Sequence, residues 1–146
     1  MHTRTGKITV LLADDHPLIR AGIRKILEQN ADIWVVGEAK DGLEAKKLVS
    51  LLRPQVLVLD LIMPAIRPSE VEKWVRENFP ETQTLILTAH DRDAYLAQTM
   101  QAGAAGYLLK NEPGERLVDA IRRIARGIKI FDEQQLARAL RWKNEV

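Results

Sequence analysis

The sequence of 146 residues contains no cysteine. A disulfide framework and a metal site with thiolate ligands are therefore excluded. No apolar run approaches the roughly 18 residues that a membrane span requires. The polar start at 1–7 is followed by only six mostly apolar residues, which are too few for the core of a signal peptide. These absences predict a cytoplasmic protein that has no membrane partner.

The chain also lacks a strong excess of charge, since its formal net charge is +2. Charged residues make up 29% and hydrophobic residues 46% of the sequence, which is typical of a soluble globular domain and excludes a disordered or collagen-like chain. The length fits one domain with a sizeable core. Only the C-terminal end is basic, and such an end is either a solvated helix face or a surface that approaches nucleic acid.

Short apolar segments without polar alternation are typical of strands that are covered on both faces. Amphipathic segments with apolar residues three and four positions apart separate them and predict helices. Strands that alternate with helices predict an α/β fold with a parallel sheet and helices on both faces. We expect five strands, near 7–13, 32–39, 55–60, 82–88 and 105–109.

The C-terminal residues fall outside the fifth strand–helix unit. The segment 134–142 is expected to be helical, with Leu136, Ala139 and Leu140 available for a contact. We interpret 7–127 as one domain and 128–146 as a linker or helical extension.

Polar side chains stand where four of the predicted strands stop. Because parallel strands end at one edge of a sheet, and ligands bind where the strand order reverses, these groups are expected to converge. The side chains are Asp14, Asp15, Asp60, Thr88 and Lys110. A neighbouring histidine, His16, has no partner at metal-ligand spacing and is predicted to be a surface or capping residue.

Three clustered carboxylates repel one another and resist ionising together. Mg²⁺ would offset that charge, because it prefers hard oxygen ligands and keeps positions open for phosphate oxygens. One carboxylate can then act as the nucleophile toward a phosphoryl group. Asp60 is our candidate nucleophile, since it ends a strand, whereas Asp14 and Asp15 begin a loop and suit metal binding. Lys110 and Thr88 would stabilise the charge on the phosphoryl oxygens.

At this point the chain resembles a known family, the receiver domains of two-component response regulators. The resemblance covers about residues 7–127. In the sequences of its motifs, the chain is most similar to the receivers that precede a LuxR-type helix-turn-helix DNA-binding domain. The resemblance rests on Leu-Leu-Ala-Asp-Asp-His-Pro at 11–17, Val-Leu-Val-Leu-Asp-Leu-Ile-Met-Pro at 56–64, Leu-Thr-Ala at 87–89 and Gly-Tyr-Leu-Leu-Lys at 106–110.

The resemblance implies a flavodoxin-like (CheY-like) sheet in the order 2-1-3-4-5. It implies that Asp60 accepts a phosphoryl group from a sensor histidine kinase. It also implies that Asp14, Asp15, Asp60 and the main-chain carbonyl of Ile62 hold Mg²⁺. Many relatives carry glycines after the Met-Pro pair, whereas the segment 65–68 of this chain is Ala-Ile-Arg-Pro.

By the same resemblance, Thr88 and Tyr107 form a switch pair. Thr88 moves toward the phosphoryl group, and Tyr107 turns inward to fill the vacated space. The surface formed by the fourth helix, fifth strand and fifth helix then shifts and controls dimerisation or an effector. Transcription would be controlled through a C-terminal DNA-binding domain that this chain does not contain.

Other functions remain open at this point. A pseudo-receiver would act through protein contacts without phosphorylation, and the unusual segment 65–68 is its best support. A Mg²⁺-dependent phosphatase is disfavoured, because the position of its second acid is taken by Ile62. A flavodoxin-type cofactor site is disfavoured too, since the acidic loop at Asp14 and Asp15 would repel a phosphate. We therefore predict a phosphoacceptor signalling domain rather than an enzyme with an external substrate.

Overall fold

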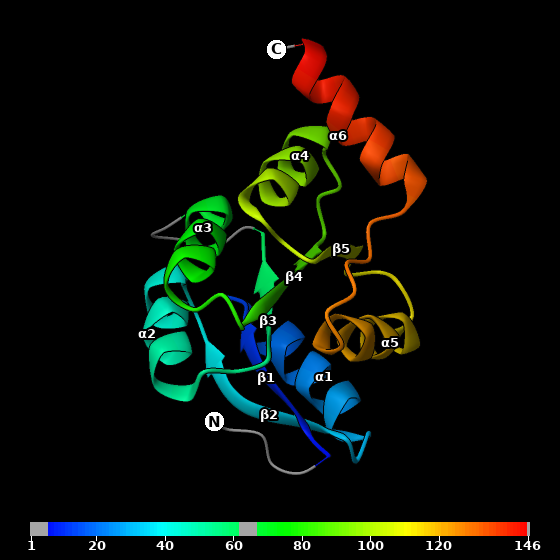
Figure 1. Cartoon of the computed structure of the whole chain (residues 1–146). Helices are drawn as coiled ribbons and strands as arrows, with labels where there is room; N and C mark the ends of the chain where they lie inside the picture. The colour runs from blue at the N-terminus through cyan, green and yellow to red at the C-terminus, as the bar shows by residue number, and fades with distance from the viewer. Residues whose placement is uncertain (1–5, 62–66, 146) are drawn as a thin grey trace.

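The computed structural model describes residues 6–61 and 67–145, and its core is a sheet of five parallel strands (Figure 1). The strand order is β2-β1-β3-β4-β5. The predicted α/β class, strand order and strand positions are therefore confirmed. The strands are β1 (Ile8–Ala13), β2 (Ile33–Ala39), β3 (Val56–Asp60), β4 (Gln83–Thr88) and β5 (Gly106–Leu109).

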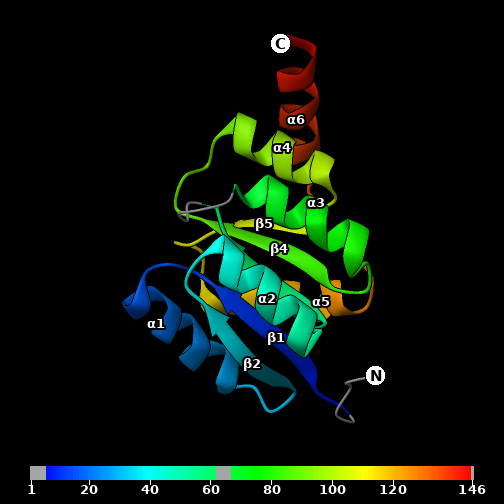
Figure 2. The ribbon, with the colours of Figure 1, turned by 90° about the vertical axis from the view of Figure 1, so that its left-hand side faces the viewer.

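Helices cover both faces of the sheet, and their bounds follow simple end signals (Figures 1 and 2). Helices α1 and α3 begin at a proline, where the missing N–H has no partner to lose. Helix α4 ends at Gly103, whose φ of 110° is left-handed. The helices are α1 (Pro17–Glu28), α2 (Gly42–Leu52), α3 (Pro68–Asn78), α4 (Asp93–Ala102), α5 (Gly114–Ala125) and α6 (Glu133–Glu145).

Two apolar clusters explain why the strand sequences show no alternation. Val10 and Leu12 of β1 join a cluster with residues of α1 and α5. Leu11 and Ala13 of the same strand join the opposite cluster, with residues of α2, α3 and α4. The central strands are therefore largely apolar along their length, whereas β2, at the edge of the sheet, is half-buried in several positions and carries Glu38.

Helix α6 lies against α4, outside the five strand–helix units (Figures 1 and 2). It is longer than the predicted 134–142 segment. The connection before it also contacts the sheet, because the N–H of Ile130 donates to the carbonyl of Ala105 at 2.8 Å. A side chain at Gly106 would collide with Ile130, so the absence of a Cβ there allows this approach. Among the described residues, no helix has the length and apolar character that a membrane crossing requires.

A charged residue, Glu72, is completely buried in α3. Arg76 donates to its Oε2 at 2.8 Å. Burial raises the pKa of Glu72, and Thr84 and Arg76 beside it offset this only in part. The folded protein therefore holds a proton on Glu72 more tightly than the unfolded chain does.

The raised pKa of Glu72 predicts that this residue makes the free energy of unfolding depend on pH. As the pH rises above about 4.5, the usual pKa of a glutamate, ionisation of Glu72 should lower the free energy of unfolding. Glu72→Gln cannot ionise, so its melting temperature relative to wild type should rise by a few degrees from pH ~4 to ~7. Thermal unfolding monitored by circular dichroism across this range measures the difference.

Glu70→Gln, on the exposed side of the same helix, is the matched control and should track wild type at every pH. Parallel curves for Glu72→Gln and wild type would contradict the assignment.

Candidate functional site

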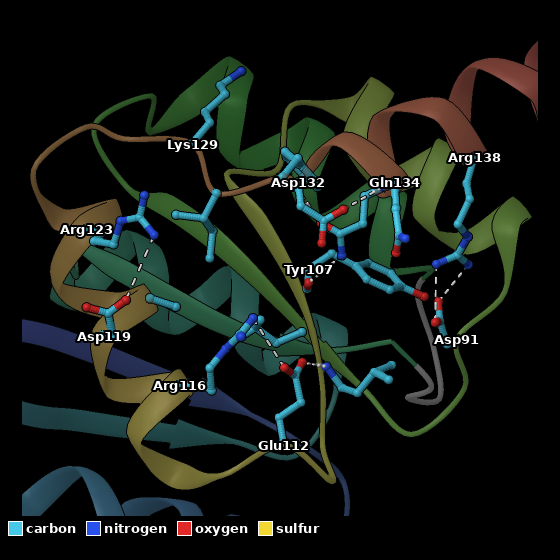
Figure 3. A pocket seen from close by; sticks show the side chains of 16 residues that line it. Asp91, Tyr107, Glu112, Arg116, Asp119, Arg123, Lys129, Asp132, Gln134 and Arg138 are labelled. Carbon is cyan, nitrogen blue, oxygen red and sulfur yellow. Dashed lines mark hydrogen bonds and ion pairs between the residues drawn. The ribbon is translucent and has the colours of Figure 1, made fainter.

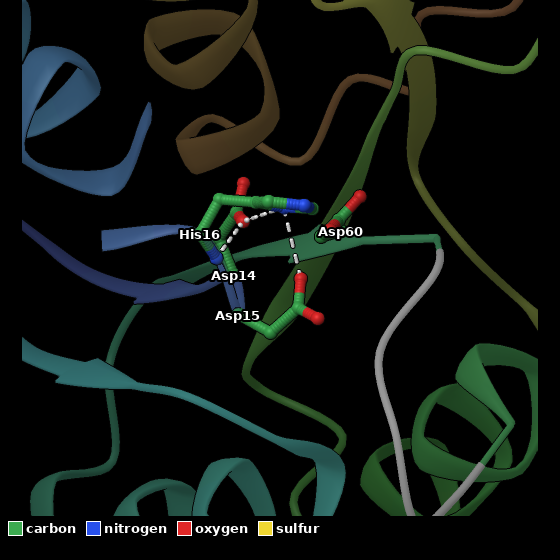
Figure 4. A group of neighbouring side chains, drawn as sticks. All are labelled: Asp14, Asp15, His16 and Asp60. Carbon is green, nitrogen blue, oxygen red and sulfur yellow. Dashed lines mark hydrogen bonds and ion pairs between the residues drawn. The ribbon is translucent and has the colours of Figure 1, made fainter. Parts of the chain in front are cut away.

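Three carboxylates gather at the carboxyl edge of β1 and β3, which are neighbours in the sheet (Figure 4). Asp14 and Asp15 follow β1, and Asp60 is the last residue of β3. One ligand atom from each of these acids, together with one from His16, lies within 4.8 Å of the others. The parallel register accounts for this, because Ala13 of β1 pairs with Leu59 of β3.

Asp14 is 4% exposed and is held from several directions. Its N–H donates to the carbonyl of Ala39 at 3.0 Å, and its carbonyl accepts from Arg20 Nη1 at 2.6 Å. Its Oδ1 accepts from the N–H of His16 at 2.8 Å. Arg20 is itself fixed by Glu38, to which its Nε donates at 2.7 Å. The position of Asp14 is therefore set by β2 and α1 as well as by β1.

Lys110 follows β5 and reaches back across the edge of the sheet to two of the acids. Its Nζ lies 2.8 Å from Asp14 Oδ2 and 3.2 Å from Asp60 Oδ1. Burial lowers the pKa of Lys110, but the hydrogen bond to Asp14 and the charges of Asp60 and Asp14 outweigh it, so the pKa is raised. Lys110 thus remains a cation and offsets part of the negative charge.

The other two predicted residues, Thr88 and Tyr107, meet at the backbone of His90. Thr88 Oγ1 accepts from the N–H of His90 at 2.9 Å and lies 3.3 Å from its carbonyl oxygen. The hydroxyl of Tyr107 donates to the same carbonyl at 3.4 Å. Tyr107 is 1% exposed, so its side chain already faces inward. Burial, with the charge of Asp91, raises its pKa to about 12, which keeps the hydroxyl a donor.

The remaining prediction concerns Ile62, which lies outside the described residues, as do positions 65 and 66 of the segment 65–68. Its main-chain carbonyl therefore stays a predicted ligand.

Sequence reasoning missed two residues at the site. His16 was expected to be a surface or capping residue, and its side chain is indeed 58% exposed. His16 is also the N-cap residue of α1, although its side chain makes no cap hydrogen bond, and its Nδ1 lies 3.0 Å from Asp15 Oδ1. Arg20 carries no signal in the sequence, since only the folded chain brings it to Asp14. For His16, adjacency to the acid pair was the available signal.

The acidic cluster suits a small divalent cation. Asp15 Oδ1 is buried and makes no hydrogen bond of good geometry to the described residues, although His16 Nδ1 is near it. A buried carboxylate oxygen that has no hydrogen-bond donor or cation beside it lowers the stability of the folded protein. Three carboxylates with a single lysine leave negative charge in excess, and the donors are the hard oxygens that Mg²⁺ prefers. Asp14, Asp15 and Asp60 therefore fit a Mg²⁺ site.

A hollow of about 630 Å³ lies elsewhere, between β5, α5 and α6 (Figure 3). Its polar side chains largely pair with one another, as in the contacts of Arg116 with Glu112 and of Arg138 with Asp91. The acidic edge, which has excess charge to neutralise, is the better candidate for chemistry.

A doubly wound parallel sheet with three acids and a lysine at its carboxyl edge defines an α/β domain of the flavodoxin-like class with an acidic cluster at that edge. A family model described as the response regulator receiver domain matches residues 10–122. The chain therefore belongs to the response regulator receiver domain family, and the predicted resemblance is confirmed.

Curated relatives agree with this assignment. The oxygen regulatory protein NreC of Staphylococcus epidermidis is 43% identical over 127 residues, covering 84% of this chain and 57% of the relative. The uncharacterized transcriptional regulatory protein YxjL of Bacillus subtilis is 42% identical over 125 residues, covering 86% and 57%. The chain thus spans little more than half the length of these relatives.

Solved structures show the same fold. A LuxR-family two-component response regulator from Aurantimonas sp. SI85-9A1 aligns with a TM-score of 0.84 at 30% identity, covering 94% of this chain and 98% of that one. The isolated REC domain of RcsB from Salmonella enterica serovar Typhimurium, solved in the presence of the phosphomimetic BeF₃⁻, aligns with a TM-score of 0.80 at 30% identity, covering 90% and 98%.

The cluster predicts a measurable cation affinity. Mg²⁺ should raise the melting temperature of the wild type by mass action. Asp15→Asn should weaken Mg²⁺ binding by about tenfold or more, because a charged ligand is lost. A titration followed by thermal unfolding measures both effects. Asp119→Asn removes an acid that is 69% exposed on α5 and should bind as the wild type does; equal affinity in all three proteins would contradict the site.

Proposed function

We propose that this chain is a phosphorylation-dependent signalling switch in which Asp60 accepts a phosphoryl group from a sensor histidine kinase. The supporting observation is the placement of Asp60, which is 4% exposed at the end of β3. Lys110 Nζ lies 3.2 Å from its Oδ1, and the oxygens of Asp14 and Asp15 are close by. No other described part of the chain combines a nucleophile, a cation and a metal-binding acid pair in this way.

Asp60 is the proposed nucleophile because it ends β3, whereas Asp14 follows β1 and lies in a loop that suits metal binding. Both carboxylate oxygens of Asp14 are engaged, Oδ1 by the N–H of His16 and Oδ2 by Lys110. In the proposed reaction an Asp60 oxygen attacks the phosphorus of a phosphohistidine, the P–N bond breaks and the imidazole leaves. Lys110 pairs with a phosphoryl oxygen and Thr88 donates a hydrogen bond to another.

Mg²⁺ would be held by Asp14, Asp15 and Asp60, and by the carbonyl of Ile62 on the resemblance alone. When bound, it would supply positive charge toward the phosphoryl oxygens. The structure of the RcsB REC domain with BeF₃⁻ supports the proposal from a relative. In this proposal the domain is phosphorylated on its own Asp60. It acts as a signalling domain and does not convert an external substrate.

The switch would run through Thr88 and Tyr107. A Thr88 hydroxyl that donates to the phosphoryl group gives up its present contact with His90, and Tyr107 lies against the same residue. The surface formed by α4, β5 and α5 then changes and favours a second copy of the chain or an effector.

The names of the relatives suggest the output. YxjL is called a transcriptional regulatory protein, and the chain covers 57% of its length. We propose that residues 7–127 form the receiver, that 128–146 link it to a DNA-binding domain, and that the parent protein regulates transcription in the cytoplasm. DNA would be bound only through that domain.

The proposal predicts one phosphoryl group per chain after incubation with Mg²⁺ and a small phosphodonor such as acetyl phosphate. Asp60→Asn should abolish the adduct, because the attacking oxygen is replaced by an amide. Lys110→Gln should slow its formation by about 100-fold, since a preorganised cation is lost. Intact-mass spectrometry over time measures the adduct.

Lys129→Gln, an exposed lysine after α5, is the control and should react at the wild-type rate. A wild type that takes no phosphoryl group in Mg²⁺ would favour a pseudo-receiver, and an adduct that persists in Asp60→Asn would contradict the nucleophile.

A further inference from the structure

An arginine of α6 binds two acids at the start of α4. Arg138 Nε donates to Asp93 Oδ1 at 2.7 Å, and its Nη2 donates to Asp91 Oδ1 at 2.7 Å. Nη1 makes a longer contact, 3.3 Å, with Asp91 Oδ2. Figure 3 shows Arg138 reaching from α6 to Asp91 beside the hydroxyl end of Tyr107. We call these three residues, Arg138, Asp91 and Asp93, the Arg138 clamp.

Exposed ion pairs generally add little to stability. The Arg138 clamp differs, because the Arg138 side chain, which is 23% exposed, divides its donors between two carboxylates in a fork geometry, although the acids themselves are 36% and 49% exposed. The hydrogen bonds from Arg138 to Asp91 and Asp93 raise its pKa. The clamp is thus a specific contact between α6 and the loop that joins β4 to α4.

Helix α6 makes a second specific contact, with β5. Gln135 Nε2 donates to the carbonyl of Tyr107 at 3.0 Å. Gln135 is oriented by Asp132, because each accepts a hydrogen bond from the other's N–H, at 2.8 and 3.1 Å. Helix α6 therefore touches the backbone of one predicted switch residue and the loop that follows the other.

The same loop carries the hydrogen bonds of the switch pair. His90 donates its N–H to Thr88 and accepts from Tyr107 with its carbonyl. Asp91 of the clamp is the next residue. If Thr88 turned toward Asp60, the His90 N–H would lose its acceptor, and the loop would have to rearrange to satisfy it. A rearrangement that moves Asp91 and Asp93 removes both carboxylates from the fork.

We propose that the Arg138 clamp couples the docking of α6 to the state of the phosphorylation site. Resting on the proposed function, this inference assigns α6 as the helix that covers the α4–β5 surface while Asp60 is unmodified. Phosphorylation draws Thr88 away from His90, displaces Asp91 and Asp93 from Arg138, and releases α6. By reciprocity, loss of the clamp makes the Thr88 rearrangement easier and strengthens binding of a phosphoryl analogue.

The test compares wild type, Arg138→Gln and Arg141→Gln by amide hydrogen exchange, with and without Mg²⁺ and beryllofluoride. Arg141 is exposed on the same helix, so its substitution removes the same charge without touching the clamp. Peptides that cover 88–93 report the loop, and peptides that cover 133–145 report α6. Melting temperatures establish that each variant is folded, and the double variant Asp91→Asn, Asp93→Asn breaks the clamp from the other side.

Without beryllofluoride, Arg138→Gln and the double variant should exchange about fivefold or more faster in α6 than wild type and Arg141→Gln do. With beryllofluoride, α6 of wild type and Arg141→Gln should reach that faster rate. Arg138→Gln should show no further change and should bind beryllofluoride more tightly.

The failures are distinguishable. If 88–93 respond to beryllofluoride but the α6 rates stay the same in every variant, the coupling is wrong and the proposed function stands. Slower α6 exchange on addition of beryllofluoride also overturns the coupling. If neither region responds in wild type, the phosphoacceptor function itself fails, and the coupling fails with it.

Discussion

The balance of charge at one edge of the sheet is the constraint on which the rest of this structure depends. Asp14, Asp15 and Asp60 come together because β1 and β3 are parallel neighbours that end side by side. Their mutual repulsion raises the free energy of the folded protein. Lys110, which follows the carboxyl end of β5, offsets part of this repulsion. The remaining negative charge is the basis for the proposal that a divalent cation, and through it a phosphoryl group, binds at this edge.

Behind this edge, the sheet is packed between two apolar clusters, one on each face. Because helices cover both faces of the sheet, the central strands are largely apolar, and the three acids and Lys110 stand at or just after the carboxyl ends of their strands. The contacts of Arg20 with Asp14 and Glu38 tie the position of one acid to β2 and α1. On the other side, the hydrogen bonds at His90 connect the strand that ends at Thr88 to the loop before α4.

Much of this arrangement follows from the sequence, and the part that does not has a physical reason. Strand positions were predictable, since uninterrupted apolar runs with polar ends are typical of buried parallel strands in an α/β chain, and the strand order followed from the resemblance to receiver domains. The gathering of Asp14, Asp15, Asp60 and Lys110 follows from that order. The contacts of Arg20, and of Arg138 with Asp91, join residues far apart in the chain, and their side chains could equally have been solvated surface charges. The sequence predicted a helix near 134–142 that was available for a contact, but its modest apolar stripe did not indicate α4 as the partner.

The most direct test of the charge-balance account is a crystal structure with beryllofluoride and Mn²⁺ in place of Mg²⁺. The account predicts an anomalous manganese peak bound by carboxylate oxygens of Asp15 and Asp60, a beryllofluoride group on Asp60, and Lys110 Nζ turned from Asp14 toward a fluorine. Manganese bound away from these acids, or an unmodified Asp60 still paired with Lys110, would contradict it.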